Sequence, residues 1–186
     1  MKKNYTLVFL LLISQFVTSQ IVINELDCDT PSTDTQEFIE LKSETPNFPL
    51  DGYVVVLFNG SPSGGNSSYF TIDLNGYYTD VNSLLLIGSN SVSPVPQLLV
   101  TPSIIQNGTS SSAADAADAV AIYQASTFDF PDGTLATTNN LIDALVYDND
   151  EDDDLNLMSL LGVTEQINEN ENGKKTNESI QRNNDG

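Results

Sequence analysis

The chain has 186 residues, of which 26 are Asp or Glu and six are Lys or Arg, so its formal net charge is −20 at pH 7. A field of this sign repels phosphate backbones and anionic headgroups, which argues against direct binding of nucleic acid. The sequence contains no His and a single Cys, Cys28. This excludes a His-assisted Ser or Cys nucleophile, an internal disulfide and the common zinc sites.

Residues 1–19 are predicted to be a secretory signal peptide. Lys2 and Lys3 precede an apolar run over residues 7–13, and small residues stand just before Gln20. The apolar run is shorter than the ~20 residues that span a bilayer. We therefore expect a protein that is secreted or held at the cell surface, with no transmembrane segment after cleavage. Residues 20–186 are expected to form one domain, in which four basic residues oppose 26 acids.

Short apolar runs bounded by turn residues predict an all-β domain. The expected strands cover residues 21–26, 37–41, 53–58, 69–73, 83–88, 119–123 and 141–147. Residues 53–58 are apolar at every position, which is typical of a central strand covered on both faces. Residues 89–117 contain three Pro residues and are expected to form an exposed, irregular insertion.

The end of the chain predicts one short helix over residues 155–162, with Asp153 or Asp154 as its N-cap and Gly162 as its stop. A last strand is expected over residues 178–182. The turn residues that follow it suggest the front of a longer protein. Seven or eight short strands and one small helix predict an antiparallel β-sandwich.

Five segments resemble, in order, the signatures of lamin-tail domains, and the likeness is greatest to the bacterial, secreted branch of that family. They are Asn24-Glu25 with residues 37–41, residues 50–57, residues 105–108 with 118–123, residues 141–147, and residues 178–182. Two features depart from the family pattern, since residues 109–117 interrupt the third segment and the last strand lacks its second half. The resemblance implies an immunoglobulin-like sandwich that serves as an accessory or surface module, often joined to secreted nucleases, phosphatases or adhesive domains.

The acidic run over residues 148–154 contains the candidate metal ligands. Asp148, Asp150 and Asp152 alternate along it, and such oxygens can converge on Ca²⁺. The run is not an EF-hand, because the Gly that follows the third acid is absent and position twelve is Ser159. The alternative is a solvated acidic loop that caps the following helix, since runs of acids are usually solvated.

Two further acidic groups are interpreted as structural. Asp27, Asp29 and Asp34 lie in a loop whose neighbouring Thr residues can hold a turn. Three glutamates lie in or beside the first two strands, where charges discourage sheet-to-sheet aggregation: Glu25, Glu37 and Glu40.

No residue pattern predicts catalysis or a resident cofactor. We therefore expect a secreted, non-catalytic module for binding, surface attachment or spacing, with a protein or cell-surface partner that the sequence does not identify. The alternative is the N-terminal accessory domain of a secreted nuclease or phosphatase whose catalytic part lies beyond Gly186.

Overall fold

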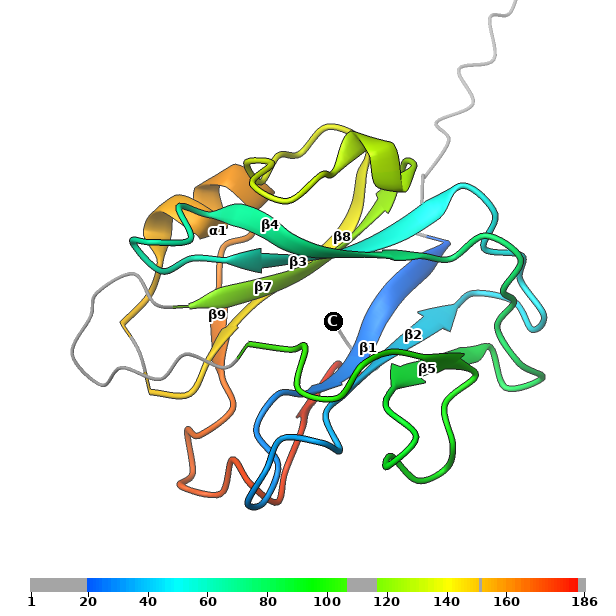
Figure 1. The fold of residues 1–186 in the computed structure, drawn as a ribbon, viewed down its shortest axis with the longest axis horizontal. Helices are drawn as coiled ribbons and strands as arrows, with labels where there is room; N and C mark the ends of the chain where they lie inside the picture. Colours follow the sequence, from blue (N-terminus) through cyan, green and yellow to red (C-terminus); the bar gives the residue numbers. More distant parts are fainter. Residues whose placement is uncertain (1–19, 107–116, 151, 184–186) are drawn as a thin grey trace, which may run out of the picture.

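The computed structural model describes residues 20–106, 117–150 and 152–183. Within these ranges the strands form two five-stranded sheets that pack face to face (Figure 1). The first sheet has the order β10-β1-β2-β5-β6 and contains β1 (Ile21–Asp27), β2 (Phe38–Ser43), β5 (Leu84–Gly88), β6 (Leu98–Leu99) and β10 (Ile180–Gln181). The second has the order β4-β3-β7-β8-β9 and contains β3 (Tyr53–Asn59), β4 (Ser67–Asp73), β7 (Asp118–Gln124), β8 (Leu141–Asp148) and β9 (Gln166–Asn168).

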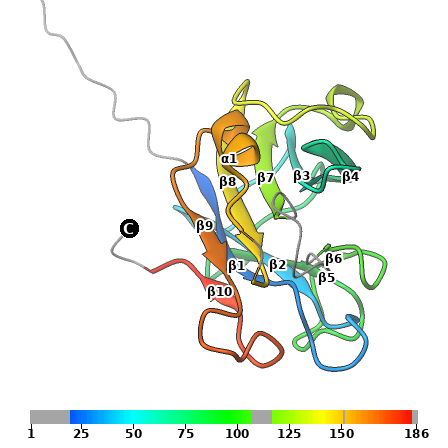
Figure 2. The same cartoon turned by 90° about the vertical axis from the view of Figure 1, so that its left-hand side faces the viewer.

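The expected fold class, an immunoglobulin-like β-sandwich with one short helix near the C-terminus, is confirmed in its two layers and in its helix. The hairpins β1–β2 and β3–β4 lie in different sheets, and the chain then alternates between the layers. Neighbouring strands are antiparallel except at two edges, where the short strands β6 and β9 run parallel to β5 and β8. Figure 2 shows β9 and β10 on the same side of the sandwich, one at the edge of each sheet.

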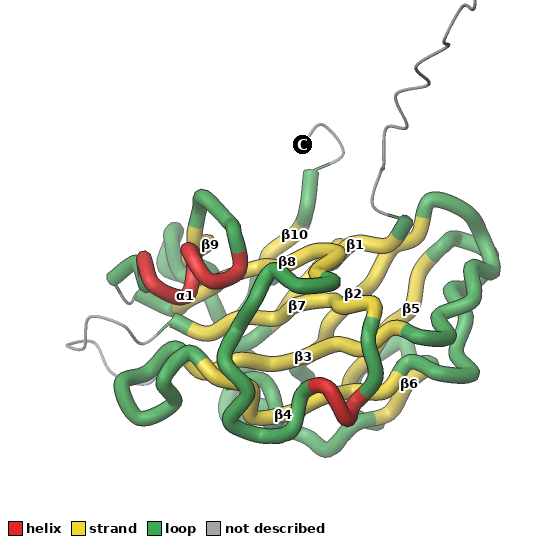
Figure 3. The backbone as a smooth tube through the Cα atoms, turned by 90° about the horizontal axis from the view of Figure 1, so that it is seen from above, coloured by secondary structure: helices red, strands yellow, loops and turns green. Residues whose placement is uncertain are grey.

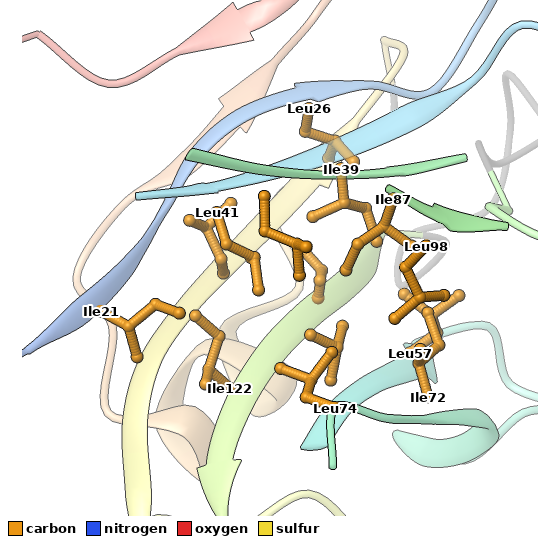
Figure 4. Close-up of a cluster of buried hydrophobic side chains, with 14 of the residues drawn as sticks. Ile21, Leu26, Ile39, Leu41, Leu57, Ile72, Leu74, Ile87, Leu98 and Ile122 are labelled. Atoms are coloured by element: carbon orange, nitrogen blue, oxygen red, sulfur yellow. The ribbon is translucent and has the colours of Figure 1, made fainter. Parts of the chain in front are cut away.

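The core between the sheets follows from the two-residue period of the strands. In β2, every second side chain is buried, from Ile39 through Leu41 to Ser43. A bulge between Ile23 and Glu25 shifts the register of β1, so that Leu26 also faces inward. Figure 4 shows these side chains meeting those of the second sheet.

Strands β3 and β7 are buried on both faces, which confirms the expectation for residues 53–58. One face belongs to the core between the sheets. The other forms a second apolar cluster that includes Phe58 and Tyr123 from these strands, together with Phe130 and Leu157 from the covering segments. Figure 3 shows helix α1 (Leu155–Leu161) near β8 and the short 3₁₀ helix η1 (Thr127–Asp129) near β4, both on this outer side.

Helix α1 is capped as the sequence predicts. The side chain of Asp154 accepts hydrogen bonds from the backbone amides of Asn156 and Leu157, at 3.0 and 2.8 Å. Gly162 adopts a left-handed conformation at the other end, with φ of 68°, which glycine tolerates best. These two residues limit the helix to seven residues.

The expected exposed insertion over residues 89–117 is wrong for its first part. Val92, Leu98 and Ile105 are buried, because the backbone turns back and pairs β6 with β5. Residues 107–116 lie outside the described residues, as does the predicted signal peptide. Across the described part of the chain, no helix has both the length and the apolar character needed to cross a membrane.

The end of the described chain ties the two sheets together. Arg182 donates from Nε to the carbonyl oxygen of Ile23 at 2.9 Å, and from one Nη to the two carboxylate oxygens of Asp143 at 3.0 and 2.8 Å. Asp143 also accepts the backbone N–H of Ile23 at 2.8 Å. Because Asp143 belongs to β8 and Ile23 to β1, this cluster joins one edge of the first sheet to the second.

Candidate functional site

A buried acidic cluster occupies one end of the sandwich, where β1 ends and β2 begins. We define it by the residues Asp27, Cys28, Asp29, Thr30, Asp34, Glu37 and Glu169. The loop that joins β1 to β2 and the loop that follows β9 lie beside one another at this end (Figures 1 and 2). The period of β2 places Glu37 on the same inward face as Ile39, and Glu37 is only 5% exposed.

Cys28 and Glu169 connect the two loops. The Cys28 thiol lies 3.0 Å from Oε2 of Glu169, and the Cys28 amide donates to Oε1 at 3.1 Å. Burial, together with the negative charge of Glu169, raises the pKa of the thiol well above its usual value. Burial also raises the pKa of Glu169 to about 7, although the hydrogen bonds from Cys28 oppose that rise. A thiol held protonated in this way is a poor nucleophile.

The outer part of the cluster contains a charged pair. Asp29 accepts a hydrogen bond from Nδ2 of Asn149 at 3.1 Å and forms an ion pair with Nζ of Lys175 at 2.9 Å. Asn149 follows β8, and Lys175 follows β9, so three segments distant in sequence meet at Asp29. This pairing holds the loop after β9 against the loop after β1.

Glu37 is the most unusual member of the cluster. Both of its carboxylate oxygens are buried, as are Oδ1 of Asp27 and Oγ1 of Thr30, and none of the four has a hydrogen-bond partner of acceptable geometry among the described residues. Burial raises the pKa of Glu37 to about 8, with a further rise from the charge of Asp34, while the nearby N–H of Ile105 partly opposes it. Burial likewise raises the pKa of Asp27 to about 7. Four buried oxygens without partners are costly in a folded protein.

Two tyrosines hold the segment around Gln106 beside this cluster. Tyr147 donates from its hydroxyl to the carbonyl oxygen of Gln106 at 2.7 Å, and the Gln106 amide donates to the hydroxyl of Tyr69 at 3.0 Å. Asn59 donates from Nδ2 to the Gln106 side chain at 2.6 Å. Burial raises the pKa of both tyrosines, so their hydroxyls stay protonated. The segment is therefore anchored rather than free.

The candidate calcium ligands of the acidic run occupy a different position. Asp148 is buried, and its carboxylate accepts hydrogen bonds from the amide of Asp150 at 3.2 Å and from the side chain of Gln166. The Asp150 carboxylate accepts from the amide groups of two Asn side chains that follow β8 in the chain, Asn168 and Asn170. Asp152 is exposed. Neutral amides thus contact the first two candidates, and the calcium site predicted here stays a prediction.

The remaining glutamates hold the edge of the first sheet together. Glu40 accepts a hydrogen bond from Nδ2 of Asn24 at 2.6 Å. Glu25 accepts from the hydroxyl of Ser179 and, at 3.5 Å, from the side chain of Gln181. The two bonds to Glu25 hold β10 against β1. Ser179 and Gln181 belong to the last of the five segments that resemble lamin-tail domains, and here they have a structural role.

A groove lies beside the last strand of the described residues. It has a volume of about 530 Å³ and lies between the β1–β10 edge of one sheet and the β8–β9 edge of the other. Apolar side chains such as Ile167 and Ile180 line it together with the polar side chains of Glu165 and Arg182. The carboxyl groups with strongly raised pKa are not among its lining residues.

No family model, curated protein or solved structure matches this chain. The resemblance to lamin-tail domains therefore stays a prediction made from the five segments alone. The chemistry of the site must be inferred from its own residues.

Sequence reasoning found part of the acidic cluster and missed the rest. It singled out Asp27, Asp29 and Asp34 as an acidic loop, and the structure brings them near Glu37. A signal for Glu37 was present, because it lies two positions before Ile39 and so falls on the inward face of β2. Glu169 lies in a polar stretch without periodicity, and only the packing of the two loops brings it to Cys28.

Proposed function

We propose that the chain is a secreted, non-catalytic β-sandwich module that resembles a lamin-tail domain and serves in binding, surface attachment or spacing. One observation supports it above the others. The carboxyl groups with the most raised pKa and the one thiol lie in a buried cluster, whereas the open groove is lined by other residues. Catalytic acids and nucleophiles must reach a substrate, so this separation favours a binding role over chemistry.

The groove is the surface on which this proposal places binding. Its lining combines apolar side chains with polar and charged ones, as binding sites usually do. It also runs beside β9 and β10, which have three and two residues and lie at sheet edges. Edge strands offer backbone donors and acceptors to an added strand of a partner.

The net charge constrains the kind of partner. With 26 acids in the sequence, nucleic acid and anionic lipid surfaces are disfavoured. A protein or a cell-surface component is the expected partner class. The alternative is that the same β-sandwich module is the N-terminal accessory domain of a secreted hydrolase. In that case the module still only binds, and a separate catalytic part of the protein carries the activity.

The first experiment tests export and catalysis together. The full chain is expressed in cells that produce it, and the protein recovered from the medium is sequenced from its N-terminus, which is expected at Gln20. The purified protein is then incubated with nucleic acids, phosphoesters, peptides and polysaccharides, with and without divalent cations. Turnover that persists through purification and follows the protein peak would refute the non-catalytic role.

The second experiment tests the groove. Binding of the labelled protein to the surface of the producing cells is compared with that of Glu165→Lys, which reverses an exposed charge at the groove. Glu44→Lys is the matched control, since Glu44 is also exposed but does not line the groove. We expect the first change to weaken binding and the second to leave it unchanged. Equal effects of the two substitutions would count against the groove.

A further inference from the structure

The outer face of the first sheet has no helix over it among the described residues. Helices α1 and η1 both lie on the outer side of the second sheet, and β1, β2 and β5 form the opposite side of the sandwich (Figure 1). Ile39 and Ile87 point into the core, so the two-residue period turns their neighbours in β2 and β5 toward this outer face. A second groove, with a volume of about 480 Å³, lies between this face and residues 92–97.

Apolar side chains form one part of the lining of this second groove. Phe38 of β2 and Leu84 and Leu86 of β5 contribute to it, and Val95 is 69% exposed beside them. The side chain of Gln97 holds residues 92–97 in place. Its Oε1 accepts the Leu86 amide at 2.8 Å, and its Nε2 donates to the carbonyl oxygen of Leu84 at 3.2 Å. The second groove is therefore formed by fixed parts of the fold.

Three carboxylates form the charged part of the lining, and no Lys or Arg is among the described residues that line the second groove. The three belong to Glu25, Glu40 and Asp80. The amides of Leu84 and Asn82 donate to the Asp80 carboxylate at 2.9 and 2.7 Å, and these hydrogen bonds lower its pKa. Asp80 therefore stays ionised at neutral pH.

Glu25 and Glu40 are placed against each other by the register of β1 and β2. They are direct cross-strand partners. Such partners have Cβ atoms ~4.5–5.5 Å apart, and like charges at this spacing destabilise a sheet. The hydrogen bonds that the two carboxylates accept come from neutral amide and hydroxyl groups. Lys42 lies two positions after Glu40 on the same face of β2 but does not line the second groove. A cation placed over the pair from outside would relieve this repulsion.

We propose that the second groove docks a basic peptide segment of a partner protein, with an Arg side chain of that segment over Glu25 and Glu40. A planar guanidinium can donate to both carboxylates at once. It can also stack on the ring of Phe38, which lies two positions before Glu40 on the same face. Apolar residues beside this Arg contact Leu86 and Val95. The inference rests on the proposed role as a binding module and assigns a further surface to it.

The charge of the lining selects this occupant over others. The groove beside β10 contains Arg182, whereas the second groove has only acids among its charged residues. Within the described residues no group of three acidic or Cys side chains could hold a metal ion, so a bare metal cation is not the occupant. A second copy of the chain brings another 26 acids and only six basic residues, and it would be repelled. A basic segment with apolar neighbours matches both parts of the lining.

The primary test uses the purified full chain and a fluorescein-labelled synthetic peptide, Gly-Val-Arg-Val-Arg-Val-Gly. Its binding is followed by fluorescence anisotropy at ~0.15 M ionic strength. In one analogue citrulline replaces both Arg residues, which keeps their shape and removes their charge. In another, Ser replaces every Val, which keeps the charge. We expect the first peptide to bind saturably and each analogue to bind at least ~5-fold more weakly. Absence of saturable binding, or equal affinity of the Ser analogue, would overturn the proposal.

Variants test the two parts of the lining separately. Glu40→Gln removes one charge of the pair and keeps an oxygen that can accept from Asn24, and Val95→Ser removes an exposed apolar contact. Each should weaken binding by about 3–5-fold. Glu44→Gln is the charge control, and Leu155→Ser is the apolar control, since Leu155 is 70% exposed and belongs to α1. Neither control residue lines the second groove, and both variants should bind like the parent. Equal effects of Glu40→Gln and Glu44→Gln would show attraction by net charge alone and refute the site.

The stability of Glu40→Gln provides a check that does not depend on the peptide. Its urea midpoint should equal or exceed that of the parent, because the substitution removes a repulsion between cross-strand carboxylates. A lower midpoint would contradict the repulsion on which the inference depends.

Backbone amide chemical shifts, followed by NMR as the peptide is added, locate the bound segment. We expect the largest changes in β2, in β5 and in residues 92–97. Changes confined to residues 162–167 and 180–183 would place the peptide in the groove beside β10. That result would overturn this inference and leave the proposed function standing. Loss of cell binding in Glu165→Lys, together with peptide binding that stays the same, would separate the two grooves.

Discussion

The cluster of Arg182, Asp143 and Ile23 allows one stability prediction to be worked out in detail. Arg182→Ala removes two hydrogen bonds to the Asp143 carboxylate and one to the carbonyl oxygen of Ile23. Hydrogen bonds to charged groups contribute ~1.5–3 kcal/mol each. The Arg182 side chain is 40% exposed, so solvent screening reduces this contribution. We expect a loss of about 2 kcal/mol in the free energy of unfolding, which is roughly 4–8 °C in Tm for a chain of this length.

The dependence of this loss on pH has a definite sign. Burial raises the pKa of Asp143, while the Ile23 amide and the Arg182 charge oppose that rise. Replacing Arg182 therefore raises the pKa of Asp143 further, and the guanidinium stabilises the fold only where the carboxyl is ionised. The loss should be largest at pH 7–8 and should shrink as the pH falls toward 4. Urea denaturation at four pH values measures it.

A double-mutant cycle tests the reasoning directly. Arg182→Ala, Asp143→Asn and the double variant are compared with the parent by urea denaturation at pH 7.5. Because the two side chains contact each other, we expect a coupling energy of ~1 kcal/mol or more. Arg182→Lys should give an intermediate loss, since Lys keeps the charge without the two-pronged geometry. A coupling energy below ~0.5 kcal/mol, with a loss that does not vary with pH, would refute the role assigned to this pair.

Three further outcomes are expected. Gly60→Ala should destabilise the fold by at least ~2 kcal/mol, because an added Cβ would lie 2.0 Å from the carbonyl oxygen of Ala117, and an unchanged urea midpoint would contradict this. Without divalent cations, the free energy of unfolding should fall as the pH rises from about 5 to about 8, since the folded state keeps on Glu37, raised to about 8, a proton that the unfolded chain has released. Glu37→Gln should flatten this dependence, and a parent curve that rises over the same range would be inconsistent with it. The Cys28 thiol, which is 0% exposed and has a raised pKa, should react with a thiol reagent only as fast as the chain unfolds, so rapid labelling in native buffer would disprove its burial.

Much of the fold could be predicted because strand burial leaves a local record in the sequence. The unbroken apolar run over residues 53–58 indicated a strand covered on both faces, and β3 is covered by the core on one side and the cluster around Phe58 on the other. The N-cap at Asp154 and the stop at Gly162 were predicted for the same reason, since capping depends on residues a few positions apart. The strands β6 and β9 were missed because they are two and three residues long and gain their backbone partners only from β5 and β8.

The candidate site was predictable only in part. The acidic loop with Asp27 and Asp34 could be seen in the sequence. Glu37 was interpreted as a charge that discourages sheet-to-sheet aggregation, and this was wrong because the structure buries it on the inward face, which it shares with Ile39. Nothing local indicated that Glu169 would lie against Cys28, which is 141 positions away. The stretch over residues 89–106 was expected to be exposed because its three Pro residues indicate irregular structure. Its apolar side chains have no regular spacing, so the sequence did not indicate that Leu98 and Ile105 would be buried.

By itself the sequence determined a two-layer β protein with one capped helix, because hydrophobic alternation, turn residues and caps act over neighbouring positions. Only the tertiary structure decided which acids are enclosed together and which face solvent. That outcome depends on how two loops, one after β1 and one after β9, pack across the end of the sandwich. Burial there removes water from Glu37, and the loss of water gives its carboxyl group a chemistry that its place in the chain does not reveal.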